Sequence, residues 1–147
     1  LRPGTAPASI GAPGLLRRLI PKLWQAFPRA TLRVRLDGGF ACPEIFTTLD
    51  DAGVEYVVAT AKNRVLLAAA QPSLAEARVL AAVRETSAQV FAETSYQANT
   101  WAQPRRVVIK SEVVMHPGRA RRDNPRFVVT NLRHAPEVVY AQIYVGR

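Results

Sequence analysis

Asp37 is the residue whose type and position best fit a chemical role. It ends residues 31–37, where apolar and charged side chains alternate as in a strand with one buried face, and Gly38-Gly39 follows. Ligands of open α/β sheets bind beyond the carboxyl ends of strands, and a carboxylate there can hold a hard cation such as Mg²⁺. The alternative is a structural aspartate that pairs with Arg33 or Arg35, or accepts hydrogen bonds from turn amides.

A single aspartate does not make a magnesium site, because metal-assisted phosphoryl chemistry usually needs two or three converging carboxylates. Glu44, Asp50 and Asp51 are close in sequence, but they lie on a predicted solvated helix, so we expect them to be surface charges. Cys42 is the single cysteine, which excludes an internal disulfide and a Cys-based zinc site. The sequence also contains no P-loop, dinucleotide fingerprint or nucleophile elbow.

A second candidate is a basic segment suited to phosphate binding. Residues 105–126 contain seven of the chain's 20 basic side chains, and Trp101 comes shortly before them. The seven are Arg105, Arg106, Lys110, Arg119, Arg121, Arg122 and Arg126. Basic side chains beside an aromatic ring suit contacts to DNA phosphates together with base stacking. The alternative is a solvated loop with Trp101 in the core, and for the tryptophan we favour the core.

The elements that would position Asp37 form a βαβ unit. Residues 42–52 have apolar side chains at helical spacing, and residues 54–60 are nearly all apolar and β-branched, as in a strand covered on both faces. Strand, helix and strand within about thirty residues predict two parallel strands. An earlier helix over residues 15–27 contains Pro21, so we expect it to be kinked or split.

The second half of the chain predicts one more helix and an antiparallel sheet. Ser73 and Glu76 form a capping box, which predicts a helix packed through Val79, Leu80 and Val83. Three β-like stretches follow at residues 90–96, 106–115 and 126–130. The turn residues between them favour antiparallel pairing. A last helix begins near the end of the chain, and we expect the chain to stop inside it.

Composition limits the class of protein. The chain has 147 residues, 48% of them hydrophobic, and a formal net charge of +9, which indicates one basic globular domain with a polyanionic partner such as nucleic acid. A basic domain without such a partner is the alternative. No apolar run approaches the roughly 20 residues of a membrane span, and we expect a cytosolic protein. Because Met115 is the only methionine, we also expect the chain to be a piece of a longer one.

Residues 35–66 carry a recognisable pattern. It consists of an Arg-x-Asp-Ser/Gly-Gly-Phe turn, a helix with an early glutamate, a Gly-Val-x-Tyr-Val strand and an Ala-Lys/Arg-Asn-Arg end. Here these positions are Arg35, Asp37, Gly39, Phe40, Glu44, Gly53, Val54, Tyr56, Val57, Ala61, Lys62, Asn63 and Arg64. Further matches lie at residues 1–4, 91–94, 105–108 and 125–132. The chain therefore resembles, over nearly its whole length, the DDE transposases of bacterial insertion sequences, and most closely the IS1380 branch of the IS4-like group.

The resemblance implies a fold and a set of site residues. The family has an RNase H-like core in which an Asp, Asp, Glu triad holds two Mg²⁺ ions. Asp37 matches the second aspartate, while the first lies on an upstream strand that this chain lacks. The glutamate belongs to a late helix with a Tyr-x-x-Arg-x-x-x-Glu pattern, in which Tyr144 and Arg147 match the tyrosine and the arginine. The fold class implied is α/β, a partial RNase H-like core with a β-rich insertion.

The same resemblance divides the chain into three parts. Residues 1–66 would belong to the catalytic core, residues 67–132 to a β-rich insertion region, and residues 133–147 to the start of the late core helix. Many relatives have serine where this chain has Gly38, a departure that leaves the metal ligand in place. Pro21 in the first helix is the other departure and concerns packing.

The implied mechanism is two-metal phosphoryl transfer that cleaves and joins transposon ends, with Asp37 on one ion and Arg33 and Arg35 near the scissile phosphate. An insertion-domain aromatic can stack on a flipped base in IS4-like transposases, and Trp101 is the best-placed candidate. We expect this chain alone to be inactive, to bind DNA and no membrane, to act in the bacterial cytoplasm at the nucleoid, and to self-associate through open sheet edges. The alternatives are a non-catalytic nucleic-acid-binding module or transposase relic, and a structural or regulatory protein without a DNA role.

Overall fold

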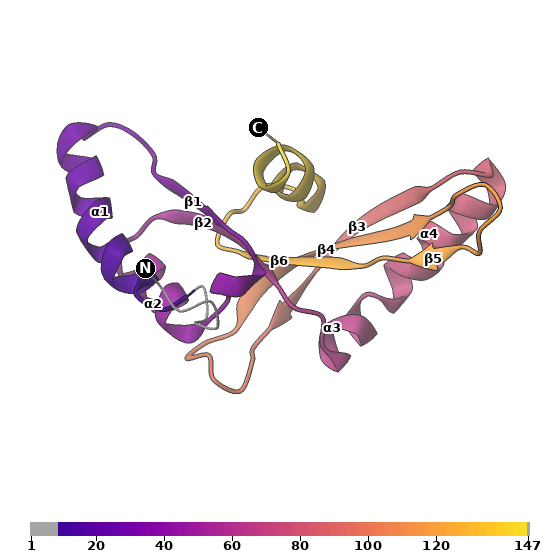
Figure 1. Cartoon of the computed structure of the whole chain (residues 1–147), viewed down its shortest axis with the longest axis horizontal. Helices are drawn as coiled ribbons and strands as arrows, with labels where there is room; N and C mark the ends of the chain where they lie inside the picture. Colours follow the sequence, from indigo (N-terminus) through magenta and orange to yellow (C-terminus); the bar gives the residue numbers. More distant parts are fainter. Residues whose placement is uncertain (1–8, 147) are drawn as a thin grey trace.

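The computed structural model describes residues 9–146 and shows helices on both faces of one six-stranded mixed sheet (Figure 1). The strands are hydrogen-bonded in the order β1, β2, β6, β4, β3, and the short β5 pairs with β4. The elements are α1 (Ala12–Ala26), β1 (Arg33–Leu36), η1 (Gly38–Phe40), α2 (Pro43–Asp51), β2 (Glu55–Thr60), α3 (Arg64–Ala69), α4 (Gln71–Arg84), β3 (Ala88–Tyr96), β4 (Arg105–Val114), β5 (Arg122–Asp123), β6 (Arg126–Thr130) and η2 (Val138–Tyr144). The predicted α/β class is confirmed.

The predicted βαβ unit is present. β1 and β2 run parallel, with Val34 opposite Tyr56 and Leu36 opposite Val58, and α2 connects them. Gly53 follows α2 with φ near +64°, a backbone conformation that glycine adopts without the steric cost of a side chain. This glycine lets the chain leave the helix and enter β2 directly.

The antiparallel pairing predicted for the later strands is also confirmed. β4 pairs antiparallel with β3 on one side and with β6 on the other. β6 in turn pairs antiparallel with β2, and Val129 lies opposite Val58. Strands from residues 1–66 and from residues 67–132 therefore share one continuous sheet.

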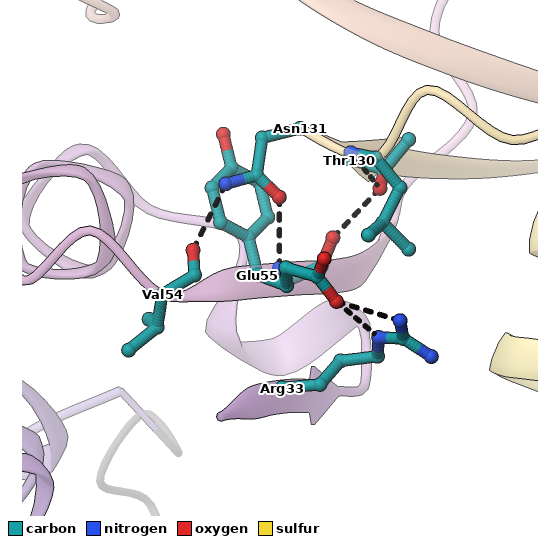
Figure 2. Close-up of polar contacts among 7 residues, drawn as sticks. Arg33, Val54, Glu55, Thr130 and Asn131 are labelled. Carbon is teal, nitrogen blue, oxygen red and sulfur yellow. Dashed lines mark hydrogen bonds and ion pairs between the residues drawn. The ribbon is translucent and has the colours of Figure 1, made fainter. Parts of the chain in front are cut away.

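Side-chain hydrogen bonds fasten β6 to β2 at the end of their ladder (Figure 2). Thr130 Oγ1 donates to the carbonyl oxygen of Tyr56 at 2.7 Å. Asn131 then bridges to β2 with its side chain: its Oδ1 accepts from the Tyr56 amide and its Nδ2 donates to the Val54 carbonyl, both at 2.9 Å. Because the amide group supplies both a donor and an acceptor, it replaces a backbone pair and extends the contact of β6 with β2.

Apolar clusters lie on both faces of the sheet. The larger one includes Phe46 and Leu49 of α2, both fully buried against the sheet. A second cluster joins Val128 of β6 to Val139 and Tyr140 of η2. Figure 1 shows η2 on the side of the sheet opposite α2 and α3. Since successive strand residues point to opposite faces, alternate residues of each strand lie on the face that η2 covers.

The helices after β2 differ from the prediction. A separate helix, α3, begins after Asn63, whose Oδ1 accepts a hydrogen bond from the Leu66 amide at 3.0 Å. α4 then begins at Gln71, so the predicted capping box is wrong. Ser73 lies inside α4, where its hydroxyl and that of Ser111 in β4 form a buried hydrogen bond of 2.7 Å. Ser73 therefore connects α4 to the sheet and does not cap the helix.

The predicted packing face of α4 is wrong for Val79 and Val83, which are 63% and 78% exposed. It is confirmed for Leu80, which is partly buried and packs against a small cluster that includes Ala77 and Ala81. The buried residues of α4 are Ser73, Leu74, Ala77 and Ala81. Three of these four side chains are small, which lets the helix lie close to β3 and β4.

Pro21 does not split the first helix. α1 runs without interruption from Ala12 to Ala26, so of the two expectations the split helix is wrong. Ile20, next to the proline, is buried in the larger cluster, and this packing holds the helix together across the missing backbone hydrogen bond. Leu15 and Leu19, on another side of α1, stay exposed.

Candidate functional site

Asp37 lies where β1 ends and the chain turns into η1. Its Oδ1 accepts a hydrogen bond from the Gly39 amide at 3.0 Å, so the carboxylate caps this turn. The side chain is exposed and forms no ion pair among residues 9–146. The turn-amide contact of a structural aspartate is therefore present, whereas pairing with Arg33 or Arg35 is absent.

The surroundings of Asp37 contribute only part of a metal site. Within residues 9–146, no group of three His, Cys, Asp or Glu side chains could hold a metal ion. Magnesium in phosphoryl-transfer enzymes takes one or two carboxylates in addition to waters and substrate phosphates. The described residues thus do not fit a complete two-metal centre, and Asp37 could supply one ligand of it.

Arg33 and Arg35 lie on the same face of β1 as Asp37, but each already has a partner. Arg33 donates two hydrogen bonds, of 2.6 and 2.8 Å, to a glutamate of β2 (Figure 2). Arg35 Nη1 donates to the carbonyl oxygens of Tyr144 at 3.1 Å and Gly146 at 2.7 Å. Arg33 therefore ties β1 to β2, and Arg35 ties the strand that carries Asp37 to the end of the late helix.

The late helix begins at Pro136 and continues as η2, which has π-helical hydrogen bonding. Tyr140 is buried, and its ring centroid lies 5.5 Å from that of Tyr144, which is half-buried. Burial raises the pKa of the Tyr140 hydroxyl, and Tyr144 adds to the effect, so this phenol stays neutral at physiological pH. Arg147, the other residue expected in this helix motif, lies outside the described residues.

Arg105 is buried in the core, which corrects its assignment to a DNA-binding surface. Its side chain is only 5% exposed, and one guanidinium nitrogen lies 2.7 Å from the carboxylate of Asp50. Another donates to the Tyr56 hydroxyl at 2.7 Å, and the group lies 4.7 Å from the centre of the Phe46 ring. Its Nε is buried and has no hydrogen-bond partner among residues 9–146. Asp50 is accordingly not the simple surface charge that we expected.

The interactions among Arg105, Asp50 and Tyr56 stabilise the charged form of Arg105. Burial opposes the charged form of Arg105, but the hydrogen bond to Asp50 and the attraction of Tyr56 and Asp50 outweigh it and raise the pKa of Arg105. Burial raises the pKa of Tyr56 to about 12, with Arg105 opposing the shift and Asp50 reinforcing it. The tyrosine therefore remains a neutral partner of an ion pair.

Trp101 also belongs to the core. It is 7% exposed, and its ring packs edge-on against Phe46 and Tyr96, with centroid distances of 4.9 and 5.3 Å. A ring enclosed in this way offers no free face to a base. The core alternative is therefore correct for Trp101, and its assignment as a stacking residue is corrected.

Arg106 and Lys110 are occupied by contacts within the chain as well. Arg106 forms an ion pair with Glu93 of β3 and donates to backbone carbonyls of the connector between β6 and η2. Lys110 forms an ion pair of 2.8 Å with Glu112 on the same strand. Arg106 consequently holds the connector that positions the late helix.

The remaining four arginines of the basic segment are exposed and form no ion pair within the described part of the chain. They are Arg119, Arg121, Arg122 and Arg126. Asp123, the acid among them, pairs instead with Arg78 of α4 at 2.5 Å. The predicted basic segment thus divides into three side chains that stabilise the fold and four that are available to an anion.

Sequence reasoning gave Lys62 no role, although the structure places it beside this group. It follows β2 and, together with Arg126, Tyr140 and Tyr144, lines a cavity of about 210 Å³. Its only signal in the sequence was its place in the Ala-Lys/Arg-Asn-Arg pattern. Strand pairing brings it to Arg126, because the end of β2 lies opposite the start of β6.

The fold and the site define a basic mixed α/β domain with a carboxylate at a strand end and exposed arginines that suit an anionic polymer. The family model for the transposase DDE domain, group 1, matches residues 1–147, and the chain belongs to this family of DDE transposases. Searches of curated proteins and of solved structures returned no match. None of the helices in the described part of the chain is long and apolar enough to cross a membrane.

Proposed function

We propose that this chain is a central part of the catalytic domain of a DNA transposase that cleaves and joins transposon ends. The observation that carries the proposal is the position of Asp37, at the carboxyl end of β1 in a chain of the DDE family. The parallel β1–β2 pair and the late helix tied to β1 through Arg35 support an RNase H-like core. We place the chain in the IS1380 branch of the IS4-like group on the sequence pattern around Asp37.

The proposed cofactor is Mg²⁺, which in such enzymes supplies Lewis-acid assistance to phosphoryl transfer. Asp37 is the residue proposed to ligate it, and its carboxylate has one oxygen committed to the turn. The other two carboxylates of the triad are proposed to come from family sequence beyond these 147 residues. We therefore expect the chain by itself to cleave no DNA.

The proposed partner is transposon-end DNA in the bacterial cytoplasm, at the nucleoid. Arginines without intramolecular partners suit phosphate contacts, whose affinity is sequence-independent and falls with salt. Self-association is a further proposal, because in the described residues β1 pairs only with β2 and β3 only with β4. Each of these strands has one unpaired edge that a second copy could extend.

The test of catalysis uses the protein made from the complete reading frame that contains this chain. The variant Asp37→Asn should lower metal-dependent cleavage of transposon-end DNA by at least about 100-fold, since a loss of about 3 kcal/mol corresponds to two decades in rate. Asp51→Asn is the matched control, because Asp51 is an exposed acid on α2 with no ion pair among residues 9–146. Equal activity of the Asp37→Asn variant and the control would refute the proposed role of Asp37.

A second candidate is a non-catalytic DNA-binding module or transposase relic. Four exposed arginines without ion pairs, together with the lack of a three-ligand metal cluster in residues 9–146, favour it. DNA binding that needs no divalent metal, with no cleavage by the protein from the complete reading frame, would select this candidate. Salt-insensitive or absent DNA binding would instead point to a structural or regulatory protein.

A further inference from the structure

Two hollows on the surface share one arginine. The first is the cavity of about 210 Å³ that Lys62, Tyr144 and Arg126 line at the end of β2. The second, of about 470 Å³, lies at the hairpin after β4, and Arg119, Arg122 and Arg126 line it. Because Arg126 lines both, the hollows are neighbours, and their basic side chains form one path along the surface.

The cations along this path form no ion pair with an acidic residue in the described part of the chain. Lys62, Arg119, Arg122 and Arg126 are exposed and absent from all ion pairs between residues 9 and 146. Asp123, next to Arg122, is held by an arginine of α4.

Glu112, whose charge interacts with that of Arg126, is already bound by Lys110 and Asn124 at 2.8 and 2.7 Å. Like charges gathered around a shared surface repel one another. An anionic ligand with several charges would turn this repulsion into attraction.

The path leads toward Asp37. β6 runs antiparallel to β2, with Phe127 opposite Thr60, so Arg126 lies at the same end of the sheet as the carboxyl ends of β1 and β2. Strand alternation places Arg126 and Asp37 on the face that η2 covers.

In the register of β1, β2 and β6, Asp37 and Arg126 are two strands and two residues apart. Strand spacing and rise then put their backbones about 12 Å from each other. With one phosphate per 3.4 Å of helix axis on each strand, this distance corresponds to about three or four nucleotides.

We infer that Lys62, Arg126, Arg119 and Arg122 form a track that binds the phosphate backbone of the DNA flanking the position of Asp37. The inference rests on the proposed function, because it takes DNA as the partner. The proposed contacts are to phosphates and not to bases: Trp101 and Tyr140 are buried, so in the described residues neither of these two rings offers a free stacking face. Contacts of this kind position a duplex and carry no sequence information.

The test measures binding of the 147-residue chain to a fluorescent duplex of 20 base pairs by anisotropy, over a series of salt concentrations. Two double variants remove the track: Lys62→Gln with Arg126→Gln, and Arg119→Gln with Arg122→Gln. The matched control is Arg17→Gln with Arg18→Gln, which removes two exposed arginines of α1, at the opposite end of the molecule from the hairpin (Figure 1). Thermal unfolding of each variant checks that the substitutions leave the fold intact.

Each track variant should lower the slope of log affinity against log salt by about 1.8, since each lost phosphate contact removes about 0.9. That change corresponds to a loss of roughly 10- to 60-fold in affinity at 0.1 M salt. The control should stay within about threefold of the parent chain, and a duplex of scrambled sequence should bind equally well.

Several results would overturn the track. Unchanged slopes for both track variants, or an equal loss in the α1 control, would show that these four side chains are not the contacts, although DNA remains the partner. Tighter binding of an RNA duplex, or a tenfold preference for one DNA sequence, would exclude a DNA backbone track. If the parent chain binds no DNA at all, the proposed function fails together with the inference.

Discussion

The buried ion pair between Arg105 and Asp50 leads to a sharp prediction about stability. Replacing Asp50 by asparagine keeps the shape of the side chain but removes the charge that faces the guanidinium. Arg105 is 5% exposed, so its charge would then remain in the core with neutral groups around it: the Tyr56 hydroxyl, the Phe46 ring and the asparagine side chain. Desolvated charges without a counter-charge are costly, and we expect Asp50→Asn to destabilise the fold.

The size of the effect follows from burial. Removing one partner of a fully buried ion pair costs about 3–5 kcal/mol. Asp50 keeps 28% of its side chain exposed, so solvent screens part of the interaction, and the asparagine oxygen still accepts a hydrogen bond. We therefore expect a loss of about 2–3 kcal/mol in the free energy of unfolding, or roughly 4–10 °C in the melting temperature.

Urea unfolding of a double-mutant cycle measures this coupling. The variants are Asp50→Asn, Arg105→Met, and the two together. The double variant should be more stable than the sum of the single losses predicts, because removing Arg105 also removes the unpaired charge. Additive losses, or an Asp50→Asn variant as stable as the parent chain, would refute the argument that Arg105 is a core residue held by Asp50. The Arg105→Met variant should also leave the salt dependence of DNA binding unchanged.

Three further predictions concern the same fold. Tyr56 has a pKa of about 12 when folded against 10.0 unfolded, so its neutral form contributes stability below pH 10 that is lost as the pH rises toward 12. From pH 10 to 12 the parent chain should therefore lose about 2 kcal/mol more than Tyr56→Phe in urea unfolding. Asn131→Ala removes both side-chain contacts that extend the pairing of β6 with β2 and should cost about 1–3 kcal/mol in the same assay. Leu74→Ala should cost about 2–5 kcal/mol and Val83→Ala less than about 0.5, which the thermal midpoints of the two variants will separate.

The strands could be predicted from the sequence because their signals are local. Alternation over residues 31–37 and the β-branched run over residues 54–60 predict β1 and β2, and parallel pairing follows from the helix between them. The neighbours of each strand could not be predicted in this way. The position of β6 between β2 and β4 depends on contacts between residues some seventy positions apart, such as Thr130 with Tyr56.

α4 shows why residue type can mislead. The prediction assigned its inner face to Val79, Leu80 and Val83, whereas the buried residues are Leu74, Ala77, Ala81 and Ser73, whose hydroxyl is hydrogen-bonded with that of Ser111. Close packing of a helix against a sheet favours small side chains. Hydrophobic periodicity in the sequence does not identify alanine and serine as core residues. Val79 and Val83 remain on the surface, where their apolar side chains are exposed to solvent.

Among the site residues, the position of Asp37 after β1 could be predicted because a strand end and a turn are visible in the sequence. The roles of the arginines could not, because they depend on where acids lie in space. Arg105 forms an ion pair with Asp50, which lies more than fifty residues earlier in the sequence. Arg122 is next to Asp123 in sequence, but Asp123 forms its ion pair with Arg78. Adjacent residues in the basic segment consequently have unrelated roles.

The pairing of charges also explains how a chain with a net charge of +9 can concentrate its unpaired positive charge on one part of its surface. Five acids of the described residues each hold one cation, and four of these five pairs include a residue of β1, β2, β3 or β4. Such pairs contribute little to the field outside the molecule, because opposite charges at hydrogen-bond distance largely cancel. The four arginines of residues 119–126 form no ion pair within the described residues, and their closeness in sequence gives one local concentration of positive charge that attracts a polyanion. Because β6 begins at the end of this segment and pairs directly with β2, Arg126 and Asp37 lie at the same end of the sheet, so a DNA backbone bound there would pass the carboxyl ends of β2 and β1 to reach Asp37.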